Sequence, residues 1–121
     1  MRRSMMQVYI KNSDKAVPFY KSVFDAETLC DHRHENGTVA HAELDIYGQV
    51  LAICETLESE VETGNAMQFC LHFGEGKDEL VRGIIARLGD SGTFTYRGST
   101  DWSPLLAGIV DKFGINWCIF V

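Results

Sequence analysis

The sequence predicts an α+β fold of two βαβββ modules that share one core, with a mixed sheet and helices on one side of it. The first observation behind this prediction is an internal repeat, because Asp-x-aromatic-Gly occurs at 45–48 and again at 111–114. Apolar runs rich in strand-forming residues flank both copies, which is typical of hairpins whose Gly has a positive φ. The order of elements before each copy is also repeated, and 121 residues suffice for one compact domain.

The first module is predicted to span about residues 1–55. Its helix is indicated by apolar residues at helical spacing, with Ser13 as the expected N-cap. Asn36-Gly37 is a turn signal between two of its strands. The predicted elements are a strand over 5–11, a helix over 14–24, and strands near 28–33, over 39–46 and over 49–53.

The second module is predicted to span about residues 66–121, after a polar linker at about 56–65. Leu80, Ile84 and Leu88 lie on one face of its helix, which is expected to end at Gly89. About 55 residues with one helix cannot bury both faces of a four-stranded sheet, so we expect the modules to form a single domain over residues 1–121. The predicted elements are a strand over 67–73, a helix over 77–88, and strands over 93–97, 104–111 and 115–121.

The period of two in strands sorts their side chains into two faces. The apolar face is expected to lie under the helices, and the other face is mixed, as in a solvent-filled cup or a polar partner surface. The apolar face collects Met6, Val8, Ile10, Ala40, Ala42, Leu44, Ile46, Leu51, Ile53, Phe69, Leu71, Phe73 and Val110. The mixed face collects Met5, Gln7, Tyr9, His41, Glu43, Ala52, Cys54, Gln68, Cys70, His72, Asn116, Cys118 and Phe120.

Charge and cysteine usage exclude several classes of function. The net charge is −6 and no block of Lys or Arg is present, which argues against nucleic acid and against an anionic membrane surface as partners. The apolar stretches are far shorter than the ~20 residues of a membrane span, and no signal sequence is evident, so we expect a cytoplasmic protein. The four cysteines form no C-x-x-C pair, and we expect reduced thiols that serve mainly in packing.

Three motifs together resemble the glyoxalase/bleomycin-resistance (vicinal oxygen chelate) superfamily, and within it the PhnB-like subgroup. They are Phe-Tyr-Lys-Ser-Val-Phe at 19–24, His-Ala-Glu-Leu at 41–44, and Trp102 followed by Asp-Lys-Phe-Gly-Ile-Asn-Trp at 111–117. The resemblance covers essentially the whole chain. It implies paired βαβββ modules that form a cup-shaped mixed sheet with helices on the outer face, in a homodimer.

Metal-dependent members of that superfamily chelate a divalent ion with four inward-pointing His and Glu side chains. The corresponding positions here hold Met5, Ala52, Gln68 and Cys118. Met and Ala cannot replace carboxylate or imidazole ligands, and Gln with Cys is a poor pair even for zinc. We therefore expect that the shared metal site is absent, and we predict no metal and no cofactor.

Residues on the mixed face are candidates for binding or catalysis. His41 and Glu43 lie two apart on one strand, either as an acid–base pair or as a hydrogen-bonded structural pair. Trp102 is either a lid over an organic ligand or a packing residue of the core or a dimer. The predicted ligand-binding residues are Tyr9, His41, Glu43, Gln68, Trp102, Cys118 and Phe120.

Two functions follow from these residues and the resemblance. The first is a metal-independent small-molecule binding protein whose ligand is unknown. The alternative is an enzyme of the lyase, isomerase or dioxygenase type. It would use a displaced metal site involving His41, Glu43 or His72, or metal-free acid–base chemistry by His41 and Glu43.

Overall fold

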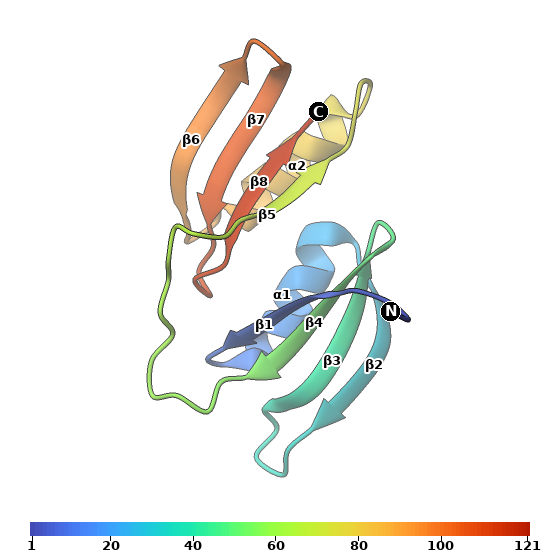
Figure 1. Cartoon of the computed structure of the whole chain (residues 1–121), viewed down its shortest axis with the longest axis vertical. Helices are drawn as coiled ribbons and strands as arrows, with labels where there is room; N and C mark the ends of the chain where they lie inside the picture. Colours follow the sequence, from blue (N-terminus) through green and yellow to red (C-terminus); the bar gives the residue numbers. More distant parts are fainter. The chain divides into compact units, whose positions relative to one another are not determined.

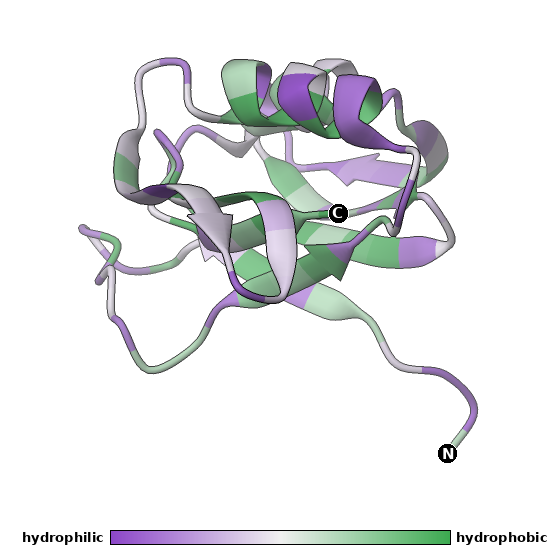
Figure 2. Cartoon of the chain, turned by 90° about the horizontal axis from the view of Figure 1, so that it is seen from above, coloured by the Kyte–Doolittle hydropathy of each residue, from purple (hydrophilic) through white to green (hydrophobic).

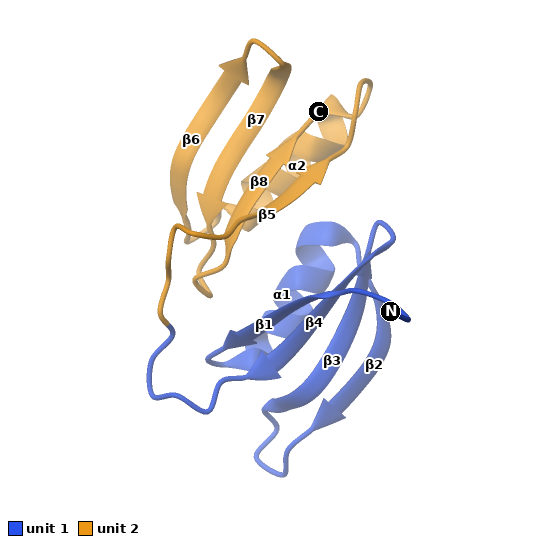
Figure 3. Cartoon of the chain, viewed as in Figure 1, with its two compact units in different colours: residues 1–61 blue, residues 62–121 orange.

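The computed structural model describes residues 1–121 and divides into two compact units, residues 1–61 and residues 62–121 (Figure 3). Each unit contains one four-stranded sheet and one helix (Figure 1). The α+β class and the βαβββ order of elements in each module are confirmed. No helix has both the length and the apolar character required to cross a membrane.

The two units share one topology. In unit 1 (residues 1–61) the strand order is β1-β4-β3-β2, and in unit 2 (residues 62–121) it is β5-β8-β7-β6. The first and last strands of each unit pair in parallel, and the other pairs are antiparallel. The elements of unit 1 are β1 Met6–Ile10, α1 Ser13–Phe24, β2 Glu27–Arg33, β3 Val39–Ile46 and β4 Gln49–Glu55. Those of unit 2 are β5 Phe69–His72, α2 Asp78–Leu88, β6 Thr93–Thr100, β7 Ser103–Val110 and β8 Asn116–Phe120.

Each helix packs its apolar side on one face of its sheet. The helices carry hydrophilic residues along one side, and the strands carry both hydrophobic and hydrophilic stretches (Figure 2). Full burial of one large aliphatic or aromatic side chain contributes about 1.5–3 kcal/mol, so these residues dominate stability. The buried helix residues are Ala16, Val17, Tyr20, Val23, Phe24, Val81, Ile84, Ile85 and Leu88, and large fully buried strand residues include Ile10, Leu44, Ile46, Leu51, Ile53, Ile109, Trp117 and Ile119.

The repeated Asp-x-aromatic-Gly motif forms both hairpin turns, and the aspartate accepts backbone hydrogen bonds in each. Gly48 and Gly114 have φ values of 90° and 87°, as the repeat predicted. Gly48 N donates to Asp45 Oδ1 at 2.6 Å in the first turn. Asp111 is buried in the second turn, where its Oδ1 accepts from two backbone N–H groups and its Oδ2 accepts from the indole of Trp117 at 2.9 Å.

The second hairpin is offset by one residue relative to the repeat. The repeat equates Val110 with Leu44, which is fully buried. In the structure Val110 instead pairs with Asn116, and residues directly opposite each other share a face. The prediction that Val110 lies under the helix was therefore wrong, and the buried Ile109 occupies that face. The cause is that the connection between β7 and β8 is longer than the one between β3 and β4. In the longer connection, the Asp111 side chain accepts the hydrogen bond of Ile115 N in place of a backbone partner in the ladder.

The predicted N-cap of the first helix was also wrong. The helix begins at Ser13, and Asn12 is the capping residue, with φ 56° and ψ 45°. The Glu55 carboxylate at the end of β4 accepts the N–H groups of Asn12 and Ser13 at 3.1 and 3.4 Å. The Ser13 hydroxyl accepts instead from Val39 N at 2.8 Å, which joins the helix start to β3. A carboxylate from a distant strand thus performs the task that the local sequence assigned to Ser13.

Candidate functional site

The sheet face of unit 1 that points away from α1 carries polar side chains from all four strands. We call this surface the unit 1 open face. Register places its members opposite one another, because Gln7 pairs with Ala52, Ala52 with Glu43, and Glu43 with Cys30. The open face comprises Gln7 and Tyr9 on β1, Ala52 and Cys54 on β4, His41 and Glu43 on β3, and Cys30 and His32 on β2.

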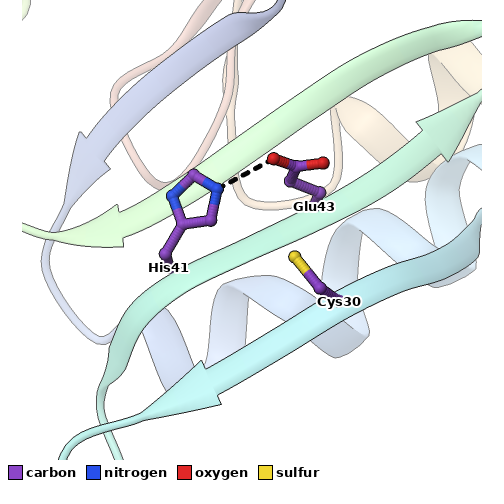
Figure 4. A group of neighbouring side chains, drawn as sticks. All are labelled: Cys30, His41 and Glu43. Carbon is purple, nitrogen blue, oxygen red and sulfur yellow. Dashed lines mark hydrogen bonds and ion pairs between the residues drawn. The ribbon is translucent and has the colours of Figure 1, made fainter.

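Glu43 is the buried charge of this face, only 6% exposed. Arg3, from the segment before β1, donates from Nη1 to Oε2 at 2.8 Å and from Nη2 to Oε1 at 2.9 Å. His41 Nε2 lies 3.0 Å from Glu43 Oε1 (Figure 4). The Arg3 guanidinium first, and His41 second, hold the pKa of the Glu43 carboxyl at about 2. Glu43 is therefore a carboxylate at neutral pH and is poorly suited to donate a proton there.

Both ring nitrogens of His41 face a partner. An ionised carboxylate only accepts hydrogen bonds, so Nε2 must carry the proton that points to Glu43. Nδ1 lies 3.7 Å from Cys54 Sγ. Burial raises the pKa of the Cys54 thiol, so Cys54 remains a protonated donor rather than a thiolate nucleophile. The imidazole is thereby fixed in orientation between β3 and β4.

Cys30 is the residue of this cluster that sequence reasoning did not select. Its sulfur and the ligand atoms of His41 and Glu43 all lie within 4.8 Å of one another (Figure 4). The pairing of β2 with β3 shifts register between Thr28 and Cys30, and this irregularity sets Cys30 opposite Glu43. The sequence contains one indication that Cys30 belongs to this face. Cys30 and His32 are two residues apart on one strand, as His41 and Glu43 are on the next.

Tyr9 is on the open face but outside this cluster. It is 58% exposed, and its hydroxyl accepts from Gln7 Nε2 at 2.6 Å. Tyr9 is the register partner of Cys54, so its ring lies along the same row of the sheet as that residue. Its predicted role in ligand binding stays a prediction.

Unit 2 presents a cluster of aromatic side chains on the corresponding face. The rings of His72 and Phe120 stack with centroids 4.5 Å apart and planes 11° apart. Trp102 meets Phe120 edge-on at 5.1 Å and 87°. Trp102 is 64% exposed, His72 is exposed and Phe120 is half-buried. We call these three residues the aromatic cluster.

Cys118 lies two residues before Phe120 on β8, and Gln68 directly precedes β5. Cys118 is the register partner of Cys70, and Phe120 is the partner of His72, so all four share a face. Burial raises the pKa of the Cys118 thiol to about 11, and a hydrogen bond with Cys70 adds to the shift. Gln68 donates from Nε2 to Asn116 Oδ1 and to Trp117 O, both at 3.2 Å. Both predicted binding residues are thus engaged within their own unit.

The four residues that the resemblance places at a metal site, Met5, Ala52, Gln68 and Cys118, do not fit a divalent ion. Ala52 is fully buried and offers no ligand atom, and Met5 offers only a thioether. The Gln68 amide is already hydrogen-bonded, and Cys118 is buried with a raised thiol pKa. A hard divalent ion needs carboxylate or imidazole ligands, which this set lacks.

Solved structures with the same fold were found by comparison. A PhnB protein from Bacillus cereus superposes with a TM-score of 0.81 at 22% identity, over 97% of each chain. TioX from Micromonospora sp. gives a TM-score of 0.67 at 20% identity, over 96% of this chain and 92% of the other. The chain has the fold of the PhnB and TioX proteins.

A fosfomycin resistance protein also shares the PhnB-like fold. A variant of FosX from Listeria monocytogenes, complexed with Mn(II) and 1S,2S-dihydroxypropylphosphonic acid, gives a TM-score of 0.63 at 18% identity. The match covers 96% of this chain and 86% of that one. No family model matches the chain. No curated protein sequence matches it either.

The predicted site residues fall into two groups, one in each unit of this fold. His41 and Glu43 are brought together in unit 1, with Tyr9 on the same sheet face. Trp102 and Phe120 are brought together in unit 2, with Cys118 on the same sheet face as Phe120, whereas Gln68 contacts Asn116 and Trp117 at the start of β8. His72, the third residue named for a displaced metal site, belongs to unit 2, where its ring is stacked on Phe120.

Proposed function

We propose that the chain binds a small organic molecule through the aromatic cluster of unit 2, without a metal ion at the superfamily's four positions. The observation that carries the proposal is the exposure of Trp102, whose indole is 64% accessible although it contacts Phe120. Large exposed aromatic side chains leave apolar area in contact with water, and a ligand that covers this area gains its transfer free energy.

The geometry of the cluster favours a planar, partly apolar ligand. Trp102 stands perpendicular to Phe120, while His72 lies parallel to it, so the three rings offer both a face and an edge. Aromatic pairs prefer offset-stacked or edge-to-face arrangements, which suit an additional ring. The His72 imidazole adds one polar group that can orient the ligand by a hydrogen bond.

The absence of a suitable ligand set supports metal-independent binding. In the FosX complex the fold holds Mn(II) together with a small phosphonic acid. The present chain keeps that fold, but its four corresponding residues are Met5, Ala52, Gln68 and Cys118. Recognition by ring stacking needs no metal ion, so the aromatic cluster can act without one.

The test is a fluorescence titration of protein dialysed against a chelator, with a panel of small planar aromatic molecules. The chain has two tryptophans, and Trp117 is fully buried, so it serves as an internal reference. We expect a bound molecule to protect Trp102 from iodide quenching while the emission of Trp117 changes little. Trp102→Ala should weaken binding about tenfold, which corresponds to ~1.4 kcal/mol.

A matched control variant tests whether Trp102 binds the ligand, and two outcomes would contradict the proposal. Trp102→Phe retains an aromatic ring and should retain most of the binding, measured by equilibrium dialysis. The proposal is wrong if Trp102→Ala binds the same molecules as tightly as wild type. It is also wrong in its metal-independent form if dialysis against the chelator abolishes binding.

The enzymatic alternative has one observation in its favour, the hydrogen bond between His41 and Glu43. A carboxylate that orients an imidazole is a common feature of general-base catalysis. Nδ1, the ring nitrogen left to accept a proton, faces the Cys54 thiol rather than solvent. We therefore rank acid–base catalysis by His41 second to binding.

A further inference from the structure

We infer that Cys30, His41 and Glu43 form a binding site for a thiophilic divalent cation of the zinc class. Their ligand atoms, one thiol sulfur, one imidazole nitrogen and one carboxylate oxygen, lie within 4.8 Å of one another. None of the three residues occupies the superfamily's four metal positions. The site is independent of the aromatic cluster, which belongs to the other unit.

The spacing of the three ligand atoms fits tetrahedral zinc after a small contraction. Zinc lies ~2.3 Å from Cys sulfur and ~2.0–2.2 Å from His nitrogen and carboxylate oxygen, so its ligand atoms are about 3.3–3.8 Å apart. A contraction from 4.8 Å by about 1–1.5 Å is within the reach of side-chain rotations. The ladder between β2 and β3 holds the backbone of all three residues in place.

The chemistry of the ligands selects a borderline-soft cation. A thiolate and a carboxylate together neutralise a divalent charge, and the imidazole adds a neutral nitrogen ligand. Magnesium and calcium prefer sets made of oxygen ligands, so they are disfavoured by Cys30. Three protein ligands leave the fourth tetrahedral position open to water or another small ligand.

Cys54 completes the surroundings of His41. The imidazole faces Glu43 through Nε2, so Nε2 is the nitrogen that would coordinate the cation, and Nδ1 lies 3.7 Å from Cys54 Sγ. Metal-ligating histidines almost always use their second ring nitrogen to donate to a nearby acceptor, which fixes the ring. When Nε2 coordinates the cation, the ring proton resides on Nδ1, and Cys54 Sγ changes from donor to weak acceptor of that hydrogen bond.

The positively charged guanidinium of Arg3 already pairs with the Glu43 carboxylate. Its guanidinium binds both oxygens of Glu43, although the Arg3 side chain is 56% exposed and belongs to the segment before β1. A cation that binds Glu43 competes with this guanidinium for the negative charge of the carboxylate. Arg3 is therefore a competitor, and its removal should strengthen metal binding rather than weaken it.

The experiment is a titration of the purified full chain with cobalt(II) and then zinc(II), with no organic ligand present. Cobalt reports the site because a thiolate ligand produces a sulfur-to-cobalt charge-transfer absorption. We expect one equivalent of cobalt with this absorption, and its loss when zinc is added. Cys30→Ser and His41→Ala should each weaken zinc binding at least tenfold, as judged by competition with a chromophoric chelator.

Two controls make the result specific. Cys70→Ser removes an exposed cysteine of unit 2 and should leave the cobalt spectrum unchanged. Arg3→Ala should increase affinity several-fold, whereas Arg2→Ala at the neighbouring exposed position should not. Circular dichroism on each variant separates loss of the site from loss of the fold.

The inference is overturned if Cys30→Ser binds zinc as tightly as wild type, or if cobalt binds without a charge-transfer absorption. A spectrum that disappears in Cys70→Ser instead would assign the metal to the cysteine pair of unit 2 and equally refute the site at Cys30. None of these results bears on ligand binding by Trp102, so the two proposals fail separately.

Discussion

Glu43 is the residue that holds the polar groups of the unit 1 open face together. It accepts hydrogen bonds from Arg3 and from His41 while its own side chain is almost fully buried. A buried carboxylate is costly unless it is paired, and here two donors supply that pairing. Substitution of Glu43 should therefore affect both stability and its dependence on pH.

The pH dependence follows from the lowered pKa of Glu43. The folded-state pKa of about 2 lies below the usual value of 4.5, so folding favours the ionised form. The resulting stability is fully present above pH ~4.5 and is lost as the pH falls toward 2. We expect the free energy of unfolding of wild type to exceed that of Glu43→Gln at pH 6, and the difference to shrink between pH 4.5 and 2, as measured by urea denaturation.

Arg3→Ala supplies the control for this assignment. Removal of the guanidinium removes the largest cause of the shift, so the acid-induced loss of stability should move to higher pH than in wild type. A profile of Arg3→Ala that coincides with that of wild type would show that Arg3 does not stabilise the Glu43 carboxylate in solution.

At the scale of single elements, the two hairpin turns use their equivalent aspartates, Asp45 and Asp111, in different ways. Asp45 is half-buried and accepts from the N–H of Gly48. Asp111 is buried and accepts from Phe113 N, Ile115 N and the indole of Trp117. The second aspartate therefore ties its turn to the core, whereas the first stabilises the turn alone.

Asp111→Ala should cost more stability than Asp45→Ala. The first change removes an acceptor from a buried indole N–H, and an unsatisfied buried donor costs about 1–3 kcal/mol. The second removes one exposed turn hydrogen bond, for which a net contribution of about 0.5–1.5 kcal/mol is typical. Denaturant unfolding of both variants measures the difference. Equal losses would mean that Asp111 does no more than form its turn.

At the scale of the whole molecule, we predict a homodimer. The resemblance implies one, and each unit exposes a large aromatic side chain, Tyr9 on β1 and Trp102 in the turn between β6 and β7. Monomeric proteins rarely leave extensive mixed and apolar faces uncovered. Light scattering at micromolar concentration should give twice the 13.6 kDa mass of one chain. The mass of a single chain would contradict this prediction, as would a mass that varies with salt but never reaches the dimer.

Much of each unit was predictable because it depends on local pattern. The strand over Val39–Ile46 has the predicted bounds, since its alternation and its flanking turns are all encoded nearby. The pairing of His41 with Glu43 also follows from period two on one strand. The shift of Val110 was not predictable from the repeat, because it depends on how the Asp111 side chain widens its turn.

The sequence by itself determined the α+β class, the two βαβββ modules and the faces of strands such as β3, because periodicity and turn residues act over short stretches of chain. Only the tertiary structure decided which side chains from different elements meet. Arg3 reaches Glu43 across 40 residues, and a register irregularity in β2 sets Cys30 beside them. Such meetings depend on strand order, register and the reach of side chains, which are set by packing of the whole sheet rather than by neighbouring residues.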